Sequence, residues 1–112
     1  MNEADVILEE LIRVIKDSQE YTQYKTALNE IKKYPEHCAR ISEYRKKNIT
    51  LQLSENLDFF AENDKLQNEF DDLAKNAMIT EFLRLEHAYC MYVKRISDKL
   101  LEESDIDTSF MD

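Results

Sequence analysis

Hydrophobic residues between positions 76 and 103 fall on two adjacent stripes of one long predicted helix. Neither Pro nor Gly interrupts this stretch, and a helix of that length is roughly 40 Å long. Successive residues of each stripe are three, four or seven positions apart, which places them on one side of a helix. The first comprises Phe82, Leu85, Tyr89, Tyr92 and Ile96, and the second comprises Ile79, Leu83, Cys90, Val93 and Leu100. One stripe buries a helix against one neighbour, so two stripes require partners on two sides. We expect part of this surface to contact another chain.

A broad apolar arc predicts a first helix over residues 3–15. Asn2 is a suitable N-cap, and Glu3 and Asp5 lie near the positive end of the helix dipole. The arc comprises Ala4, Ile7, Leu8, Leu11, Ile12, Val14 and Ile15. It is wider than one groove needs, so a second partner is expected here too. The candidate partner interface is therefore Phe82, Leu85, Tyr89, Tyr92, Ile96, Ile7 and Leu11, and the pattern leaves open which apolar stripe is core.

Polar signals place the next two helices. Asp17 and Glu20 have the spacing of a capping box, so a second helix begins after Asp17. It is expected to end at Tyr34, because the residue before a proline is pushed out of the helical region. Pro35 suits the first turn of a third helix. The alternating segment 49–53 resembles a strand, but we interpret it as helix because no other strand signal accompanies it.

The following segment, residues 54–63, is predicted to be a turn region whose aromatic residues pack down onto the fold. A fourth helix covers about residues 64–75, with Leu66, Phe70 and Leu73 directed inward. The tail, residues 104–112, is acidic and poor in apolar residues, which predicts disorder.

A weak internal repeat at an offset of 42 residues relates the two halves of the chain. It aligns Tyr24, Leu28 and Ile31 with Leu66, Phe70 and Leu73. Any two amphipathic helices align in this way, so a chance match stays open. We predict an all-α fold of about five helices in an antiparallel bundle built from two helical hairpins, with a long C-terminal helix. Residues 1–103 are expected to form a single helical domain.

Composition excludes several kinds of enzyme site. The 112 residues include no Gly and one Pro, so a phosphate-binding P-loop, a dinucleotide-binding turn and a G-x-S-x-G elbow are all excluded. A di-iron bundle site needs Glu-x-x-His on one helical face. Glu86 and His87 are adjacent instead, and they point about 100° apart on a helix. We predict no enzymatic activity, no catalytic or metal-binding residues and no cofactor.

Two alternative functions stay open. Cys38 and Cys90 both sit at candidate core positions and fit no C-x-x-C pattern. Two chains would nevertheless supply the four thiolates that an iron–sulfur cluster needs, which suggests a redox-responsive protein. Basic residues cluster at 32–33, 45–47 and 94–95 and would contact RNA or an acidic partner if they converged. Against direct nucleic-acid binding stands the net charge of −9, which repels phosphate backbones.

Membrane insertion is not expected. The N-terminus is acidic where a signal peptide is basic, and the chain has no stretch of eighteen apolar residues. A cytoplasmic location is the simplest interpretation.

Three segments of the sequence match fixed patterns of a known family. Residues 17–24, DSQEYTQY, resemble the signature S-x-E-Y-x-x-Y of the YlbF/YmcA family of small bacterial helical regulators. Tyr34-Pro35-Glu36 is similar to a D-P-E start of the central helix, with Tyr34 in place of Asp. Residues 73–86 are similar to L-x-x-N-P-x-x-x-x-Y-L-x-A-E, with Ala77, Phe82 and Leu85 where Pro, Tyr and Ala are usual. The resemblance extends over about residues 4–100.

The resemblance implies an all-α fold, dimerisation and no enzyme activity. Family members include regulators of competence, sporulation and biofilm formation, and some of those act in a complex that adjusts mRNA processing. Members of that complex carry cysteines near the C-terminus that hold iron–sulfur clusters, whereas the tail here, SDIDTSFMD, has no Cys. Our leading hypothesis is a non-enzymatic cytoplasmic regulator or adaptor. Its expected partners are a second copy of itself, in a homodimer, or paralogous helical proteins, in a hetero-oligomer.

Overall fold

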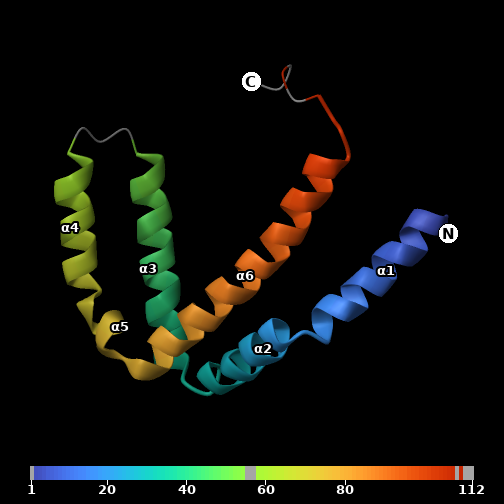
Figure 1. The fold of residues 1–112 in the computed structure, drawn as a ribbon. Helices are drawn as coiled ribbons and strands as arrows, with labels where there is room; N and C mark the ends of the chain where they lie inside the picture. The colour runs from blue at the N-terminus through green and yellow to red at the C-terminus, as the bar shows by residue number, and fades with distance from the viewer. Residues whose placement is uncertain (1, 55–57, 108, 110–112) are drawn as a thin grey trace. The chain divides into compact units, whose positions relative to one another are not determined.

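The computed structural model describes residues 2–54, 58–107 and 109, which form helices joined by short turns (Figure 1). No strand occurs among these residues. The predicted all-α class is confirmed, with a long C-terminal helix and one short helix beyond the expected five. In chain order the helices are α1 (Glu3–Lys16), α2 (Gln19–Ile31), α3 (Pro35–Leu53), α4 (Phe59–Glu69), α5 (Asp71–Lys75) and α6 (Ala77–Glu103).

The chain divides into two compact units, whose boundaries fall inside α2 and α6. We call Thr26–Arg84 the central unit, and Met1–Lys25 together with Leu85–Asp112 the terminal unit. Each is described separately below. The single domain expected over residues 1–103 stays a prediction.

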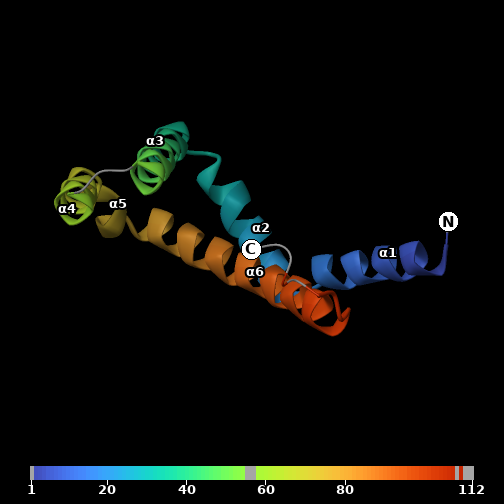
Figure 2. The ribbon, with the colours of Figure 1, turned by 90° about the horizontal axis from the view of Figure 1, so that it is seen from above.

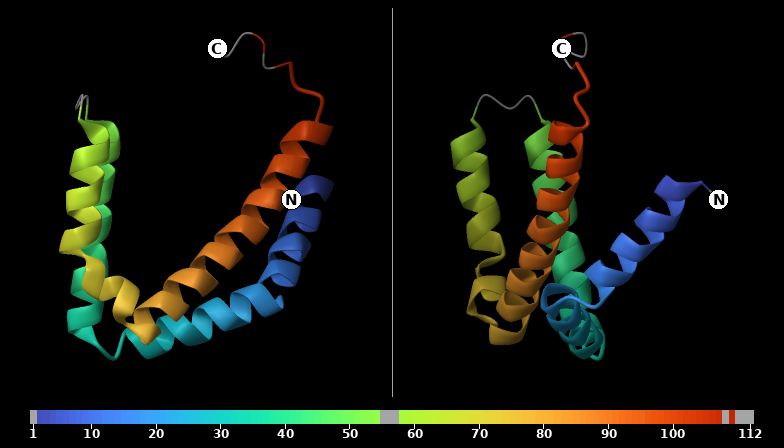
Figure 3. Two further views of the ribbon diagram at one scale, coloured as in Figure 1. Left: turned by 60° about the vertical axis from the view of Figure 1, so that its left-hand side comes forward. Right: turned by 45° about the vertical axis from the view of Figure 1, so that its right-hand side comes forward.

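The hydrophobic core lies in the central unit. Its members come from five helices and the α4–α5 junction: Ile31, Ile41, Leu66, Phe70, Leu73, Ile79 and Phe82. The inward positions predicted for Leu66, Phe70 and Leu73 are therefore confirmed. Two views show α3 and α4 lying side by side as an antiparallel pair (Figures 1 and 2). The short α5 follows at the base of α4 and leads into α6 (Figure 3).

Side-chain caps determine where α1, α2 and α6 begin. Asn2 Oδ1 accepts a hydrogen bond from the Asp5 N–H at 2.8 Å, as predicted for the cap of α1. Asn76 Oδ1 accepts from the Ile79 N–H at 3.0 Å at the start of α6. The cap predicted for α2 was wrong by one residue, because the Tyr21 N–H donates to Ser18 Oγ at 3.1 Å.

Asp17 ends α1 instead of starting α2. Its backbone is in the right-handed helical region (φ −91°, ψ −4°), and its N–H donates to the Arg13 carbonyl at 3.0 Å. An N-cap residue has extended backbone angles, which Asp17 lacks. The second helix also ends earlier than predicted, at Ile31, because Lys32 and Lys33 form a turn before Tyr34 and Pro35. Pro35 opens α3 as predicted, and α3 continues as helix to Leu53.

Residues 54–63 are not the single turn region predicted. Helix α4 already begins at Phe59. Phe60 is 84% exposed, so this side chain does not pack onto the fold as predicted. Leu57, which we expected in that turn, lies outside the described residues. The predicted fourth helix is also interrupted, because Phe70 has non-helical angles (φ −107°, ψ 24°) and separates α4 from α5.

Candidate protein interface

Helix α1 presents an apolar face that the rest of the terminal unit leaves largely uncovered. None of its residues is buried, and Ile7 is 61% exposed. Leu11 and Ile15 are half-buried. Charged residues occupy the other side, where Arg13 pairs with Glu10 and, at 3.0 Å, with Asp17. Arg13 holds the pKa of the Glu10 carboxyl below its ordinary value through a hydrogen bond and charge attraction. An amphipathic helix exposed in this way is suited to contact another helical surface.

The first stripe of α6 passes from core to half-buried surface along its length. Phe82 is 5% exposed and belongs to the core of the central unit. Leu85, Tyr89, Tyr92 and Ile96 are half-buried in the terminal unit. Phe82 and the other four residues of this stripe thus lie in different units. Their role as an interface stays a prediction.

Tyr89 is held by two aromatic neighbours on α2. Its ring stacks on Tyr24 at 5.3 Å between centroids and meets the edge of Tyr21 at 5.4 Å. Burial raises the pKa of the Tyr89 phenol above its ordinary value, and the neighbouring Tyr21 and Tyr24 act in the same direction. This cluster joins α2 to α6 within the terminal unit, so Tyr89 has a packing role within a single chain.

The second stripe of α6 is the more exposed one toward the C-terminal end. Ile79 is buried and Leu83 half-buried, whereas Cys90, Val93 and Leu100 are exposed. Leu100 is 65% exposed. The sequence pattern identified this stripe but gave no reason to prefer it as an interface, since both stripes have the same helical spacing.

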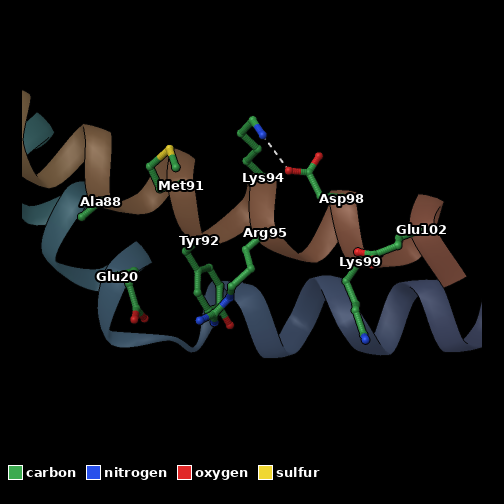
Figure 4. Close-up of a pocket in the computed structure, with 9 residues that line it drawn as sticks. All are labelled: Glu20, Ala88, Met91, Tyr92, Lys94, Arg95, Asp98, Lys99 and Glu102. Atoms are coloured by element: carbon green, nitrogen blue, oxygen red, sulfur yellow. Dashed lines mark hydrogen bonds and ion pairs between the residues drawn. The ribbon is translucent and has the colours of Figure 1, made fainter.

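A shallow hollow of about 650 Å³ lies along α6 in the terminal unit (Figure 4). Its lining comes from α6 and from Glu20 of α2. Arg95 lies 5.8 Å from the ring centre of Tyr92, and both side chains point to the same side of α6. Lys94 and Asp98 point to another side and pair at 2.6 Å. Charged side chains make up most of the lining, which also contains Ala88, Met91 and Tyr92.

A family model decides which group of proteins this sequence belongs to. The model described as "control of competence regulator ComK, YlbF/YmcA" matches residues 7–103. The chain belongs to this family. The resemblance in the sequence is therefore confirmed, and so is a regulatory role at the level of the family description. No curated protein and no solved structure matches the chain.

The two histidines of this YlbF/YmcA protein lie in different surroundings. His37 stacks on Tyr34 at 5.3 Å, and its Nε2 lies 3.5 Å from the Asn76 amide nitrogen. His87 is exposed on α6. Within the described ranges no group of three His, Cys, Asp or Glu residues is placed to hold a metal ion. These positions suggest structural or surface roles for both histidines.

The cysteines of the YlbF/YmcA protein lie in different units. The Cys38 thiol, in the central unit, donates to the Ile31 carbonyl at 3.3 Å and is half-buried. Cys90, in the terminal unit, is exposed. We expected both at core positions, which is wrong for Cys90. An iron–sulfur cluster shared between two chains stays an untested alternative.

Each basic cluster of the YlbF/YmcA protein uses at least one cation in an internal ion pair. Lys33 pairs with Glu30 at 3.0 Å, Lys94 with Asp98 at 2.6 Å, and Lys47 with Glu69. This pairing lowers the positive charge available for RNA, although the alternative stays untested. As to membranes, no described helix combines the length and the apolar character needed to cross one.

Proposed function

We propose that this protein is a non-enzymatic cytoplasmic adaptor that regulates by assembling with other proteins through its helical faces. The observation that carries the proposal is the exposed apolar face of α1, a helix without a buried residue in a chain that has a core elsewhere. Covering one Ile or Leu side chain contributes about 1.5–3 kcal/mol. A partner that covers several residues of this face would therefore bind with useful affinity.

A second copy of the chain or a paralogous helical protein is the partner we propose. Both would present amphipathic helices of the same kind, and a twofold arrangement lets one apolar face cover its equivalent. The family consists of competence regulators. We extend this to a role in sporulation or biofilm control through a complex that adjusts mRNA processing, as the resemblance implies.

The proposal is tested by placing a charge on each side of α1. Ile7 lies within the apolar arc and Val6 lies outside it, yet both are exposed, at 61% and 53%. Light scattering at micromolar concentration would measure assembly of the wild type, of Ile7→Asp and of the matched control Val6→Asp. We expect Ile7→Asp to weaken self-assembly, or capture of a purified paralogue, while Val6→Asp does not. A wild-type chain that stays monomeric and captures no paralogue would contradict the proposal.

A further inference from the structure

The central unit contains a second surface, a groove of about 290 Å³ between the end of α2 and one face of α3. The α3 residues on it follow a helical spacing of three and four: Cys38, Ile41, Ser42, Arg45, Lys46 and Ile49. Leu28, Ile31 and Lys32 contribute from the end of α2, and Phe82 from α6. We call this surface the α2–α3 groove.

The length and depth of the α2–α3 groove suit a helix. Cys38 and Ile49 mark its ends on α3 and are separated by three helical turns, roughly 16 Å. The volume, about 290 Å³, is small for this length, so the groove accepts a few side chains in a row and not a bulky ligand. Amphipathic helices bind in this way, with apolar residues at positions i, i+3 or i+4, and i+7 inserted into the groove.

The charge around the α2–α3 groove is opposite to that of the whole chain. The sequence carries 24 acidic and 15 basic residues, yet Lys32, Arg45 and Lys46 line the groove and no Asp or Glu does. Lys32 and Lys46 are exposed and have no ion pair among the described residues. A partner with carboxylates beside its apolar stripe would complement these ammonium groups.

We propose that the α2–α3 groove binds a short acidic amphipathic helix of a partner protein. Its apolar residues would lie over Ile41 and Ile49, and its carboxylates would approach Lys32 and Lys46. This inference rests on the proposed function for the existence of a protein partner, but it concerns a surface that does not include α1. The two are separable, because variants of the groove leave Ile7 unchanged.

A fluorescent peptide of about four helical turns tests the proposal directly. The probe carries leucines at spacings of three and four with glutamates beside them, and the control peptide has lysine for each glutamate. Fluorescence anisotropy would measure binding of each to the full chain. We expect the glutamate peptide to bind, the lysine peptide to bind at least about tenfold more weakly, and added salt to reduce the difference.

Matched variants assign binding to the groove. Lys32→Glu with Lys46→Glu should weaken binding of the glutamate peptide about tenfold. Lys16→Glu with Lys25→Glu changes the net charge equally outside the groove and should have no such effect. Ile49 is 58% exposed, so Ile49→Asp should weaken binding without unfolding the chain, whereas Thr50→Asp, next to it but outside the lining, should not. Circular dichroism of each variant confirms folding.

Cys38 provides a second readout that locates the peptide. In a Cys90→Ser background Cys38 is the one remaining thiol, and peptide bound in the groove should slow its reaction with a thiol reagent several-fold. The proposal is overturned if the glutamate peptide fails to protect Cys38 or binds the Lys32→Glu, Lys46→Glu variant as tightly as the wild type. It is also overturned if dodecanoate protects Cys38 and the peptide does not, since the groove would then bind an acyl anion.

Discussion

The guanidinium of Arg40 donates two parallel hydrogen bonds to the carboxylate of Asp72, from Nε to Oδ2 at 3.1 Å and from Nη2 to Oδ1 at 2.9 Å. The two residues are 32 positions apart and join α3 to α5. Arg40 Nη2 also donates to the Glu69 carbonyl at 2.6 Å, and the guanidinium lies 4.0 Å from the ring centre of Phe70. One side chain thus fixes the junction of α4 and α5 against α3.

Removing this contact should destabilise the central unit. We expect Arg40→Ala to lower the melting temperature by several degrees. The substitution removes both hydrogen bonds to Asp72, the hydrogen bond to the Glu69 carbonyl and the packing on the Phe70 ring. Arg40→Lys should recover only part of the loss, since lysine cannot form the paired geometry. Thermal denaturation followed by circular dichroism measures both. Arg13→Ala is the control, because Arg13 forms exposed ion pairs with Glu10 and Asp17, which are near it in sequence. An equal loss of melting temperature in Arg13→Ala would contradict the expectation.

The Arg40–Asp72 pair should also make the stability of the fold depend on pH. The hydrogen bond from Arg40 holds the pKa of Asp72 below its ordinary value of 3.8. A carboxyl whose pKa is lower in the folded state stabilises the fold above its unfolded pKa, and this contribution is lost as the pH falls through the folded pKa. We expect the urea midpoint to be steady from pH 7 to about 5 and to fall below about 4. The urea midpoint of Asp72→Asn should be lower than that of the wild type at pH 7, and it should fall less steeply as the pH decreases. Parallel acid profiles for variant and wild type would show that Asp72 does not contribute.

The break at Phe70 shows what sequence patterns do not predict. Leu66, Phe70 and Leu73 have helical spacing, so the pattern identified them correctly as core but placed them in one helix. In the structure the Glu69 carbonyl accepts from Arg40, 29 positions away, and the Leu73 N–H donates to the Phe70 carbonyl at 3.0 Å. A long-range contact of this kind leaves no signal in local periodicity. Local chemistry, by contrast, predicted the cap at Asn2 and the start of α3 at Pro35, because both depend on neighbouring residues.

The candidate interface was predictable only in part. Spacing identified the arc containing Ile7 and both stripes of α6, since it depends on helix geometry alone. It did not show that Phe82 is buried in the core, or that Leu100 is exposed. Those outcomes depend on which other helices cover α6, and that is set by tertiary packing. The α2–α3 groove was missed for the same reason, although the spacing of Cys38, Ile41 and Lys46 on one helical face gave a signal.

Tyr89 allows packing within the chain to be separated from contact with a partner. We expect Tyr89→Ala to lower the free energy of unfolding by about 1–2 kcal/mol, because it removes a half-buried ring from Tyr21 and Tyr24. Tyr89→Phe keeps the ring and should be close to neutral. Urea denaturation of the three proteins measures this. If Tyr89→Ala left stability unchanged but reduced assembly, Tyr89 would belong to the partner interface instead.

Hydrogen–deuterium exchange should distinguish α1 from the central unit. Amides of α1 are expected to exchange fastest among the long helices, since no residue of that helix is buried and local opening exposes little additional apolar surface. Amides around Ile41 and Phe82 should exchange slowly, because they belong to the core. Raising the protein concentration, or adding a purified paralogue, should slow exchange in α1 if its apolar face becomes covered. The Ile7→Asp variant should lose that concentration dependence and keep slow exchange in the core. Protection of α1 equal to that of the core in a strictly monomeric sample would mean that its face is already covered within one chain, and it would then not be free for an adaptor role.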